Sequence, residues 1–396
     1  MQLLGYLDGE GHGAAGLEAA FDELLTGSGA GDTLLCTVNA QGKLRAEPVL
    51  TPADSGAVGV QLTLSREIQQ TAEAVANETM QSGCILVLDT ANAKVRACVS
   101  RPGYDPENIS ASLNAPDSPL LERAFQCYAV GSVFKPVLAA TALEAGLQPV
   151  FECTGAVVVD GQIFRCAGGV PHGQVDLAAA LEKSCNGYFI RLGQQLGAES
   201  LLDAAKAFGF GQSLLLAEGF AAEAGQLPTP QELAQSGQLA NFSFGQGSLL
   251  ATPMQVAALF NTLAADGVYR APYVLQATLD EATGQPVETL SHPRGRRVIS
   301  AQNAALLRAM LVQVVQQGTA QDAAGLSGGA GGKTGTAQTG QFTPEGTERC
   351  NLWFAGFWPA EKPRYTIVVL QDGAVHTAYS GAAIFAQVCT ALEAAG

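Results

Sequence analysis

A serine and a lysine three residues apart, Ser132 and Lys135, lie in the apolar run AVGSVFKPVL (residues 129–138). Residues at i and i+3 share a face of a helix, so the two side chains are expected to lie within reach of each other. Burial lowers the pKa of a lysine, and a neutral amine can take the proton of a serine hydroxyl. The stretch also fits an exposed lysine on an amphipathic helix that merely follows a serine. The pair is a candidate nucleophile and base that needs support from elsewhere in the chain.

Two further polar clusters give that support. Ser184 and Asn186 stand two apart in LEKSCNGYF, between two apolar helical runs. The stretch GGKTGTAQ opens a predicted strand with Lys333, Thr334, Gly335 and Thr336. The chain therefore carries S-x-x-K, S-x-N and K-T-G in one order, at a helix start, an inter-helix loop and a strand. Each motif alone is weak, but the ordered set predicts one active site.

The residue types fit a serine nucleophile activated by lysine. A Ser-His-Asp triad is poorly supported, because none of the histidines has an obvious carboxylate partner or a place near Ser132; these are His12, His172, His292 and His376. Desolvation and a second cation, Lys333, would both lower the pKa of Lys135. Gly131 lets the chain turn into the helix, whose first N–H groups can face developing negative charge.

The K-T-G strand fits a peptide-binding edge. Side chains alternate along a strand, so Thr334 and Thr336 point the same way and can both donate to a substrate carboxylate. Gly335 between them lets another backbone lie close against the strand. A peptide substrate could pair with this edge as an added strand.

The remaining pattern predicts an α+β fold. A helix is expected from Ser65 to Gly83, then a β-hairpin over residues 84–102. The middle, roughly 130–320, is mostly helical, with one helix between Thr252 and Gly267 and another between Ser300 and Gly318. Strands follow in GKTGTAQT, LWFAGFWPA and RYTIVVLQD, and a last helix near 380–394. This order predicts an antiparallel sheet that joins strands from both ends of the chain.

Composition narrows the function classes. The 396 residues carry a net charge of −15, which argues against nucleic acid or an anionic membrane as an electrostatic partner. No apolar run is long enough to span a membrane, and the first residues do not form a signal peptide. Taken alone this indicates the cytoplasm, and it also fits a chain whose anchor lies outside this sequence.

The nine cysteines are scattered, with no CxxC pair, which argues against a zinc site. Most of the cysteines have apolar neighbours in the sequence and are expected to be small core residues. Only Cys153 and Cys166, which flank TGAVVVDGQIFR, are spaced as a hairpin disulfide would be. Whether they pair is left open, because connectivity does not follow from sequence.

Longer stretches resemble the transpeptidase domain of class B penicillin-binding proteins. They are LTLSREIQQTAEAV, SFGQGSLLATPMQVAALFNTLAADG, GKTGTAQ and NLWFAGFWPAEKPRYTIVV. The resemblance runs from about residue 61 to the C-terminus, which gives a transpeptidase domain over residues 61–396. GLEAAFDELLTG resembles the end of the pedestal that precedes this domain in the family, so residues 1–60 are expected to be a partial, dimerisation-type pedestal segment.

The resemblance implies a five-stranded antiparallel sheet flanked by helices, and a D,D-transpeptidase acting on stem peptides that end in D-Ala-D-Ala. Ser132 would be the nucleophile, which β-lactams also acylate, and Lys135 the base. Ser184 and Asn186 would relay protons, with Lys333 supporting that network. Thr334, Gly335 and Thr336 would bind the substrate carboxylate, and the N–H groups of Ser132 and Thr336 would form the oxyanion hole. No cofactor and no metal is implied. Val130 and Val133 depart from the family, which often has Pro and Thr there.

The resemblance also implies a location and partners. The protein would act on the extracytoplasmic face of the bacterial cell membrane, held by an N-terminal helix absent from this sequence, beside a glycosyltransferase. Within the same chemistry, a β-lactam-hydrolysing or β-lactam-sensing protein is the alternative. A catalytically silent cell-wall scaffold is a second alternative, which the three intact motifs argue against.

Overall fold

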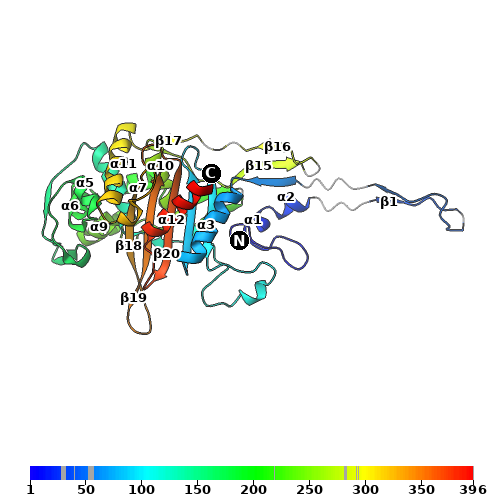
Figure 1. Cartoon of the computed structure of the whole chain (residues 1–396), viewed down its shortest axis with the longest axis horizontal. Coiled ribbons are helices and arrows are strands. Elements are labelled where there is room, and N and C mark those ends of the chain that lie inside the picture. The colour runs from blue at the N-terminus through cyan, green and yellow to red at the C-terminus, as the bar shows by residue number, and fades with distance from the viewer. Residues whose placement is uncertain are drawn as a thin grey trace. The chain divides into compact units, whose positions relative to one another are not determined.

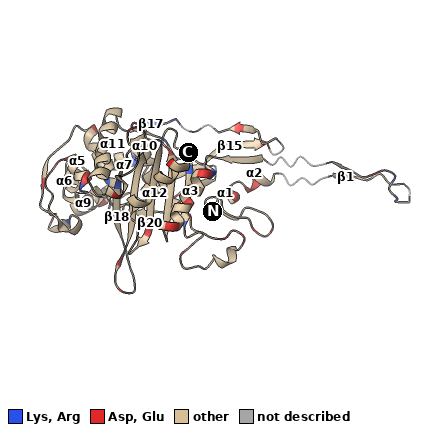
Figure 2. Ribbon diagram, in the orientation of Figure 1, with Lys and Arg blue, Asp and Glu red and all other residues tan. Residues whose placement is uncertain are grey.

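The structure, a computed structural model, describes residues 1–27, 33–39, 41–51, 58–217, 219–280, 283–290, 292 and 294–395 (Figure 1). Contacts divide the chain into two compact units. The first comprises Met1–Gln2, Leu64–Val274 and Pro293–Gly396, and the second comprises Leu3–Thr63 and Leu275–His292. Figure 2 shows how few charged residues the ribbon carries, in keeping with a charged fraction of 14%.

The first unit is built on a five-stranded antiparallel sheet in the order β18-β19-β20-β4-β5. The strands are β4 (Gly83–Asp89), β5 (Val95–Arg101), β18 (Gly331–Phe342), β19 (Glu348–Trp358) and β20 (Tyr365–Ala374). Two strands come from near residue 90 and three from beyond residue 330, so the predicted α+β fold with a sheet joining both ends of the chain is confirmed. The K-T-G motif lies on β18, at the edge of the sheet.

Helices cover both faces of this sheet. On one face α12 (Gly381–Ala395) lies beside α3 (Arg66–Thr79), and Phe385 of α12 packs on Phe354 of β19 (Figure 1). On the other face lies α10 (Pro253–Ala264), where Asn261 accepts a hydrogen bond from Thr366 of β20. Phe354 pairs with Val369, three positions from Thr366, so the two contacts are on opposite faces. Both faces are covered, which is why β4 and the first six residues of β20 are mostly apolar and buried.

Local sequence rules account for the helix starts. Thr252 and Gln255 form the predicted capping box of α10, and Ser300 accepts the backbone N–H of Asn303 at the start of α11 (Ala301–Gln316). Ser65 occupies the N-cap of α3, but its side chain makes no capping bond. The ends differ from expectation: α3 stops at Thr79 and α10 at Ala264, a few residues before the predicted glycines.

The rest of the first unit is helical with short strand pairs. The helices are α4 (Lys135–Glu144), α5 (Leu177–Glu182), α6 (Asn186–Leu196), α7 (Ala198–Ala207), α8 (Pro230–Leu233) and α9 (Ser236–Ser243). The pairs are β6 (Tyr128–Ala129) with β13 (Leu250–Ala251), β7 (Phe151–Cys153) with β10 (Gly173–Val175), β8 (Ala156–Val159) with β9 (Gln162–Arg165), β11 (Leu214–Ala217) with β12 (Phe220–Ala222), and β14 (Val268–Tyr269) with β17 (Arg296–Arg297).

The second unit holds a three-stranded sheet, β16-β15-β3, and a two-stranded pair, β1-β2. Its elements are α1 (Gly16–Ala20), α2 (Asp22–Thr26), β1 (Thr33–Leu35), β2 (Val49–Thr51), β3 (Val58–Leu62), β15 (Leu275–Asp280) and β16 (Pro286–Thr289). The stretch GLEAAFDELLTG forms two short helices that meet at Phe21. The role of residues 1–60 as a pedestal segment stays a prediction. Within the described ranges, no helix has the length and apolar character needed to cross a membrane.

Candidate active site

Ser132 lies on a tight turn that another part of the chain holds in place. The turn is a 3-10 helix, η3 (Gly131–Phe134), and the α-helix begins only at Lys135, whereas the sequence predicts one helix through both residues. In a 3-10 turn residues i and i+3 are eclipsed, so Ser132 and Lys135 keep the predicted stacking. Gly131 has a φ of 63°, and a Cβ there would meet the carbonyl oxygen of Thr336 at 2.8 Å. Only glycine allows this approach of the turn to β18.

Lys135 is fully buried, and its ammonium group is directed at the second motif. Nζ donates to the carbonyl oxygen of Ser184 (2.8 Å), to Ser184 Oγ (3.1 Å) and to Asn186 Oδ1 (2.7 Å). None of these hydrogen bonds goes to Ser132. Burial lowers the pKa of Lys135 to about 7, so an appreciable fraction of the amine is neutral near neutral pH.

The junction between α5 and α6 presents Ser184 and Asn186. Ser184 has a φ of 53°, a left-handed conformation that non-glycine residues adopt rarely and that is often found at functional sites. Cys185 is the N-cap of α6, and its Sγ accepts the N–H of Tyr188. Asn186 accepts from Lys135 and donates through Nδ2 to the carbonyl oxygen of Arg165 at 2.9 Å. Its amide group is therefore fixed at both ends.

Strand β18 forms the opposite side of the site. Lys333 is fully buried, and both burial and the nearby charge of Lys135 hold its pKa well below its usual range. The sequence predicts that desolvation and Lys333 both lower the pKa of Lys135; in the structure burial lowers it, and Lys333 is not among the causes. A Cβ on Gly335 would lie 3.0 Å from Val133 Cγ1 and 3.2 Å from the Val130 carbonyl oxygen. The two valines are thus the surface on which the glycine packs.

A cavity of about 860 Å³ joins these elements. Of the predicted site residues, it is lined by Ser132, Ser184, Asn186, Thr334, Gly335 and Thr336. Lys135 and Lys333 do not line it, because they are buried behind its wall. The structure therefore brings all three motifs to one cavity, with the two amines on its protein side.

Several residues of the cavity are not singled out by the motifs. Thr319 lines it and its Oγ1 lies 2.6 Å from Thr334 Oγ1. The β8–β9 hairpin contributes residues 162–165, followed by 166 and 167. Phe244, Gln246 and Gly247 of the SFGQG stretch also line it, and Gly131 N–H donates to the Gly245 carbonyl oxygen at 2.8 Å. The SFGQG loop therefore both packs against the nucleophile turn and faces the cavity.

Trp353 on β19 is 2% exposed. Its Nε1 donates to the carbonyl oxygen of Ala129 at 3.0 Å. The indole therefore belongs to the core of the sheet and holds the segment that leads to Ser132.

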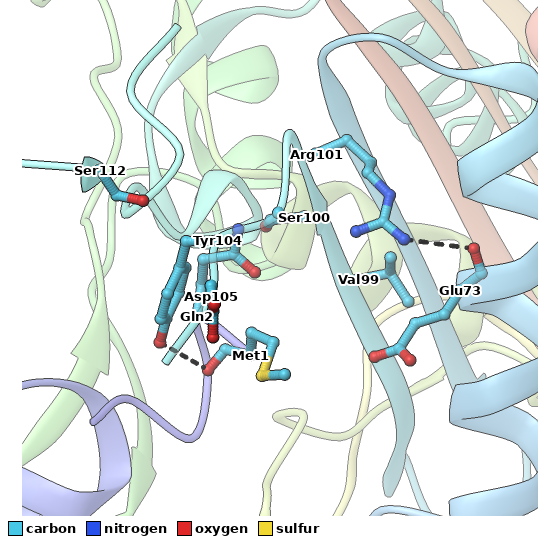
Figure 3. Close-up of a pocket in the computed structure, with 10 residues that line it drawn as sticks. Met1, Gln2, Glu73, Val99, Ser100, Arg101, Tyr104, Asp105 and Ser112 are labelled. Carbon is cyan, nitrogen blue, oxygen red and sulfur yellow. Dashed lines mark hydrogen bonds between the residues drawn. The ribbon is translucent and has the colours of Figure 1, made fainter. Parts of the chain in front are cut away.

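A separate cavity of about 540 Å³ lies elsewhere in the first unit (Figure 3). Across it Arg101 Nη2 donates to the Glu73 carbonyl oxygen and Tyr104 OH to the Met1 carbonyl oxygen, each at 3.3 Å. Its lining contains serines but no lysine, so it lacks a serine and lysine pair like that of Ser132 and Lys135.

One group of side chains could hold a metal ion. Three thiols and one imidazole, from Cys153, Cys166, Cys185 and His172, have ligand atoms within 4.8 Å of one another. We call them the Cys3His group. The sulfur of Cys153 lies 3.7 Å from that of Cys166, beyond the about 2.05 Å of a disulfide, and both residues are free thiols. The spacing that suggested a hairpin disulfide thus brings these cysteines together without a covalent bond.

Comparison with known proteins agrees with the fold and the motifs. The model of the penicillin binding protein transpeptidase domain matches residues 83–390. The peptidoglycan D,D-transpeptidase PbpA of Mycolicibacterium smegmatis is 32% identical over 97% of this chain and 80% of its own length.

Solved structures are similar as well. The D,D-transpeptidase domain of a peptidoglycan glycosyltransferase from Eggerthella lenta has a TM-score of 0.83 and 26% identity, covering 100% of this chain and 90% of that one. The ceftriaxone acyl-enzyme of penicillin-binding protein A from Mycobacterium tuberculosis has a TM-score of 0.76 and 28% identity, covering 86% and 80%. The chain belongs to the penicillin-binding protein transpeptidase family, and its relatives are class B penicillin-binding proteins.

Proposed function

We propose that the protein is a peptidoglycan D,D-transpeptidase that forms an acyl-enzyme on Ser132 from stem peptides ending in D-Ala-D-Ala. The observation that carries the proposal is the buried amine of Lys135. It lies one 3-10 turn from Ser132, is bonded to Ser184 and Asn186, and stands behind a cavity whose other side is the K-T-G strand. Similar proteins that are known as peptidoglycan D,D-transpeptidases support the same reaction class.

In the acylation step, Ser132 Oγ attacks the carbonyl carbon between the two D-Ala residues. Neutral Lys135 takes the Oγ proton, and Ser184 Oγ, which is hydrogen-bonded to Lys135 Nζ, passes a proton to the leaving nitrogen. An ester bond forms, the peptide bond breaks, and D-Ala leaves as a free amine. Asn186 keeps the amine oriented through its Oδ1, and Nδ2 stays bonded to the hairpin.

Strand β18 binds the substrate peptide. Because it is the edge strand, the groups on its outer side are open to an incoming peptide. Thr334 and Thr336 donate to the terminal carboxylate, and Lys333 supports the network from behind. The N–H groups of Ser132 and Thr336 stabilise the oxyanion, and the close approach of Gly131 to the Thr336 carbonyl group supports this assignment.

In the second step the amine of a neighbouring stem attacks the ester, forms the cross-link and frees Ser132. A β-lactam acylates the same serine. Solved β-lactam acyl-enzyme complexes of penicillin-binding protein A from M. tuberculosis, a similar protein, support this step. Such a reaction takes place on the extracytoplasmic face of the cell membrane. There we place the protein, held by a membrane anchor and working with a glycosyltransferase partner.

The lifetime of a penicillin adduct tests the function. Intact-mass spectrometry after penicillin addition should show one adduct on the wild-type chain that persists for hours, and none on Ser132→Ala. An adduct that forms and clears within minutes would instead indicate a β-lactam-hydrolysing enzyme. If the folded wild-type chain forms no adduct, the protein is a scaffold and the proposal is wrong.

A further inference from the structure

Three of the ligand–ligand distances within the Cys3His group match those of a tetrahedral zinc site, and all four ligand atoms lie within 4.8 Å of one another. With Zn–S bonds of about 2.3 Å and a Zn–N bond of about 2.0 Å, a regular tetrahedron separates two sulfurs by about 3.8 Å and a sulfur from a nitrogen by about 3.5 Å. The structure has 3.7 Å for Cys153 to Cys166, 3.8 Å for Cys166 to Cys185, and 3.4 Å from Cys153 Sγ to His172 Nδ1. We propose that the Cys3His group binds one Zn²⁺ ion.

Ordered backbone, more than side-chain flexibility, brings the four ligands together. Cys153 and Cys166 stand on either side of the β8–β9 hairpin, and the Cys166 N–H donates to the Gly155 carbonyl oxygen at 2.9 Å. The His172 N–H donates to the Cys153 carbonyl oxygen at 3.0 Å. Gly155 has a φ of 90°, and a Cβ there would lie 2.2 Å from the Gly169 carbonyl oxygen. The turn is therefore built so closely that only glycine fits, which fixes the spacing of the ligands.

The surroundings of the sulfurs resemble those of metal thiolates. The backbone N–H of Tyr188 donates to Cys185 Sγ at 3.4 Å, and that of Gly187 donates to Cys166. Such second-sphere donors stabilise thiolate ligands. The alternative is that the cysteines are small apolar core residues, since all three are at most 5% exposed. An apolar core gives no reason for an imidazole nitrogen to be aimed at a sulfur, whereas a metal site does.

The ligand set selects the metal and its role. Thiolates and imidazole suit Zn²⁺, whereas Ca²⁺ and Mg²⁺ prefer oxygen ligands. Four protein ligands complete a tetrahedron and leave no position for water, so the ion is structural and takes no part in hydrolysis. Binding releases the protons of the three thiols to solvent and leaves the imidazole neutral.

The ion would hold the second motif in place. Cys185 stands between Ser184 and Asn186, and Cys166 follows Arg165, whose carbonyl oxygen accepts from Asn186 Nδ2. One ion therefore joins the N-cap of α6 to the hairpin that lines the cavity. The hairpin also packs on α6 and α9 through a cluster of Val159, Phe164, Ile190 and Ala240. We infer that zinc is a positioning element for Asn186; this effect rests on the proposed function, whereas zinc binding does not.

Metal analysis of the full chain tests the binding. Elemental mass spectrometry should find about one zinc per wild-type chain, and X-ray absorption should show three sulfur neighbours and one nitrogen. His172→Ala and Cys166→Ser should lose the zinc, whereas Cys350→Ser, a half-buried cysteine outside the group, should keep it. Wild-type protein that contains no zinc, or that carries a Cys153–Cys166 disulfide in peptide maps, would overturn the proposal.

A measurement on the wild-type chain does not depend on variants that fold. After removal of zinc by a chelator, one equivalent of Co²⁺ should restore the visible absorption of a tetrahedral cobalt thiolate. A spectrum of octahedral cobalt, or none, counts against the site.

Acylation measured beside metal content separates this proposal from the proposed function. Penicillin labelling should slow about tenfold or more in His172→Ala, with Cys350→Ser unchanged, because a displaced Asn186 no longer orients the amine. If the chain binds zinc but is never acylated by penicillin, the zinc site is supported and the proposed transpeptidase function is refuted. Zinc-free His172→Ala that acylates at the wild-type rate would refute the positioning role.

Discussion

The rate of Ser132 acylation should follow the protonation of Lys135. Only the neutral amine can accept the serine proton, and burial lowers the pKa of Lys135 from the ordinary 10.5 to about 7. At pH 7 about half of the molecules carry a neutral amine, whereas a lysine of ordinary pKa would be neutral in about one molecule in 3,000. Burial therefore raises the fraction of active base by about a thousandfold.

Charges near the Lys135 amine also shift its pKa, but by less than burial does. Lys333 lies on β18 with its side chain buried, and its repulsion with Lys135 favours a state in which only one of the two is charged. Negative charge on the neighbouring pair of Cys166 and Cys185 acts the other way and raises the pKa of Lys135. Burial remains the largest influence, so the midpoint should stay near neutral pH.

Stopped-flow labelling with a fluorescent penicillin, from about pH 5 to about pH 9, measures this dependence. The second-order rate constant should fall tenfold per unit below the midpoint and level off above about pH 8, so that pH 5 is about 50-fold slower than pH 7. Lys135→Arg is the matched control, because a guanidinium keeps the cation but does not deprotonate in proteins. A profile without a step, a midpoint near 10.5, or normal labelling of Lys135→Arg would refute the reasoning.

Three further changes should have measurable effects. Gly335→Ala places a methyl group 3.0 Å from Val133 Cγ1, which should displace β18 from the nucleophile turn and slow labelling by about 10-fold to 100-fold. Thr319→Val removes the hydroxyl that meets Thr334 at 2.6 Å and should cost about 1 kcal/mol of acylation efficiency, measured as a rate constant. The pKa of Lys135 is lower in the folded chain than in the unfolded chain, so the unfolded chain binds more protons between pH 7 and pH 10.5. The free energy of unfolding should therefore rise with pH in this range, by up to about 1.4 kcal/mol per pH unit, as measured by urea titration.

Matched variants give these effects a baseline. Gly325→Ala adds a methyl group in open space and should label normally. Thr347→Val, on an exposed turn outside the cavity, should do the same. Lys135→Met should lessen the rise of stability with pH, whereas Lys183→Met, at an exposed position, should not. Equal behaviour of a test variant and its control would contradict the corresponding prediction.

Local sequence patterns, such as helix caps and the order of helices and strands, predict much of the fold. The capping box of Thr252 and Gln255 and the cap at Ser300 lie within a few neighbouring residues, so the helix starts follow from sequence alone. The order of strands and helices gives the α+β class, which the five-stranded sheet confirms. Helix ends are less well predicted. At Gly83 the chain already enters β4, because pairing with β20 competes with continued helix.

The site is predictable where a motif marks it and not where distant segments meet. Ser132, Ser184 and Thr334 belong to recognisable spacings, and they line one cavity. Thr319 has no such spacing, since only packing of the end of α11 beside β18 brings its hydroxyl to Thr334. The roles assigned to these residues stay predictions.

The Cys3His group shows the same limit. Its ligands are 13, 6 and 13 residues apart along the chain, at positions 153, 166, 172 and 185. The lack of a CxxC pair argues against zinc in the sequence, because that rule covers only ligands delivered by one tight turn. Here the end of β7, the residue after β9, the residue before β10 and the α5–α6 junction supply them, and their meeting depends on the tertiary fold.

The central claim is that Ser132 forms an acyl-enzyme with a stem peptide. A thioester analogue of a peptide ending in D-Ala, quenched with acid and digested, allows the acylated residue to be located by mass spectrometry. The account predicts one acyl group, on the peptide containing Ser132, that disappears when an acceptor amine is added and is absent from Ser132→Ala. An acyl group on another residue, or a folded wild-type chain that acquires none, would contradict it.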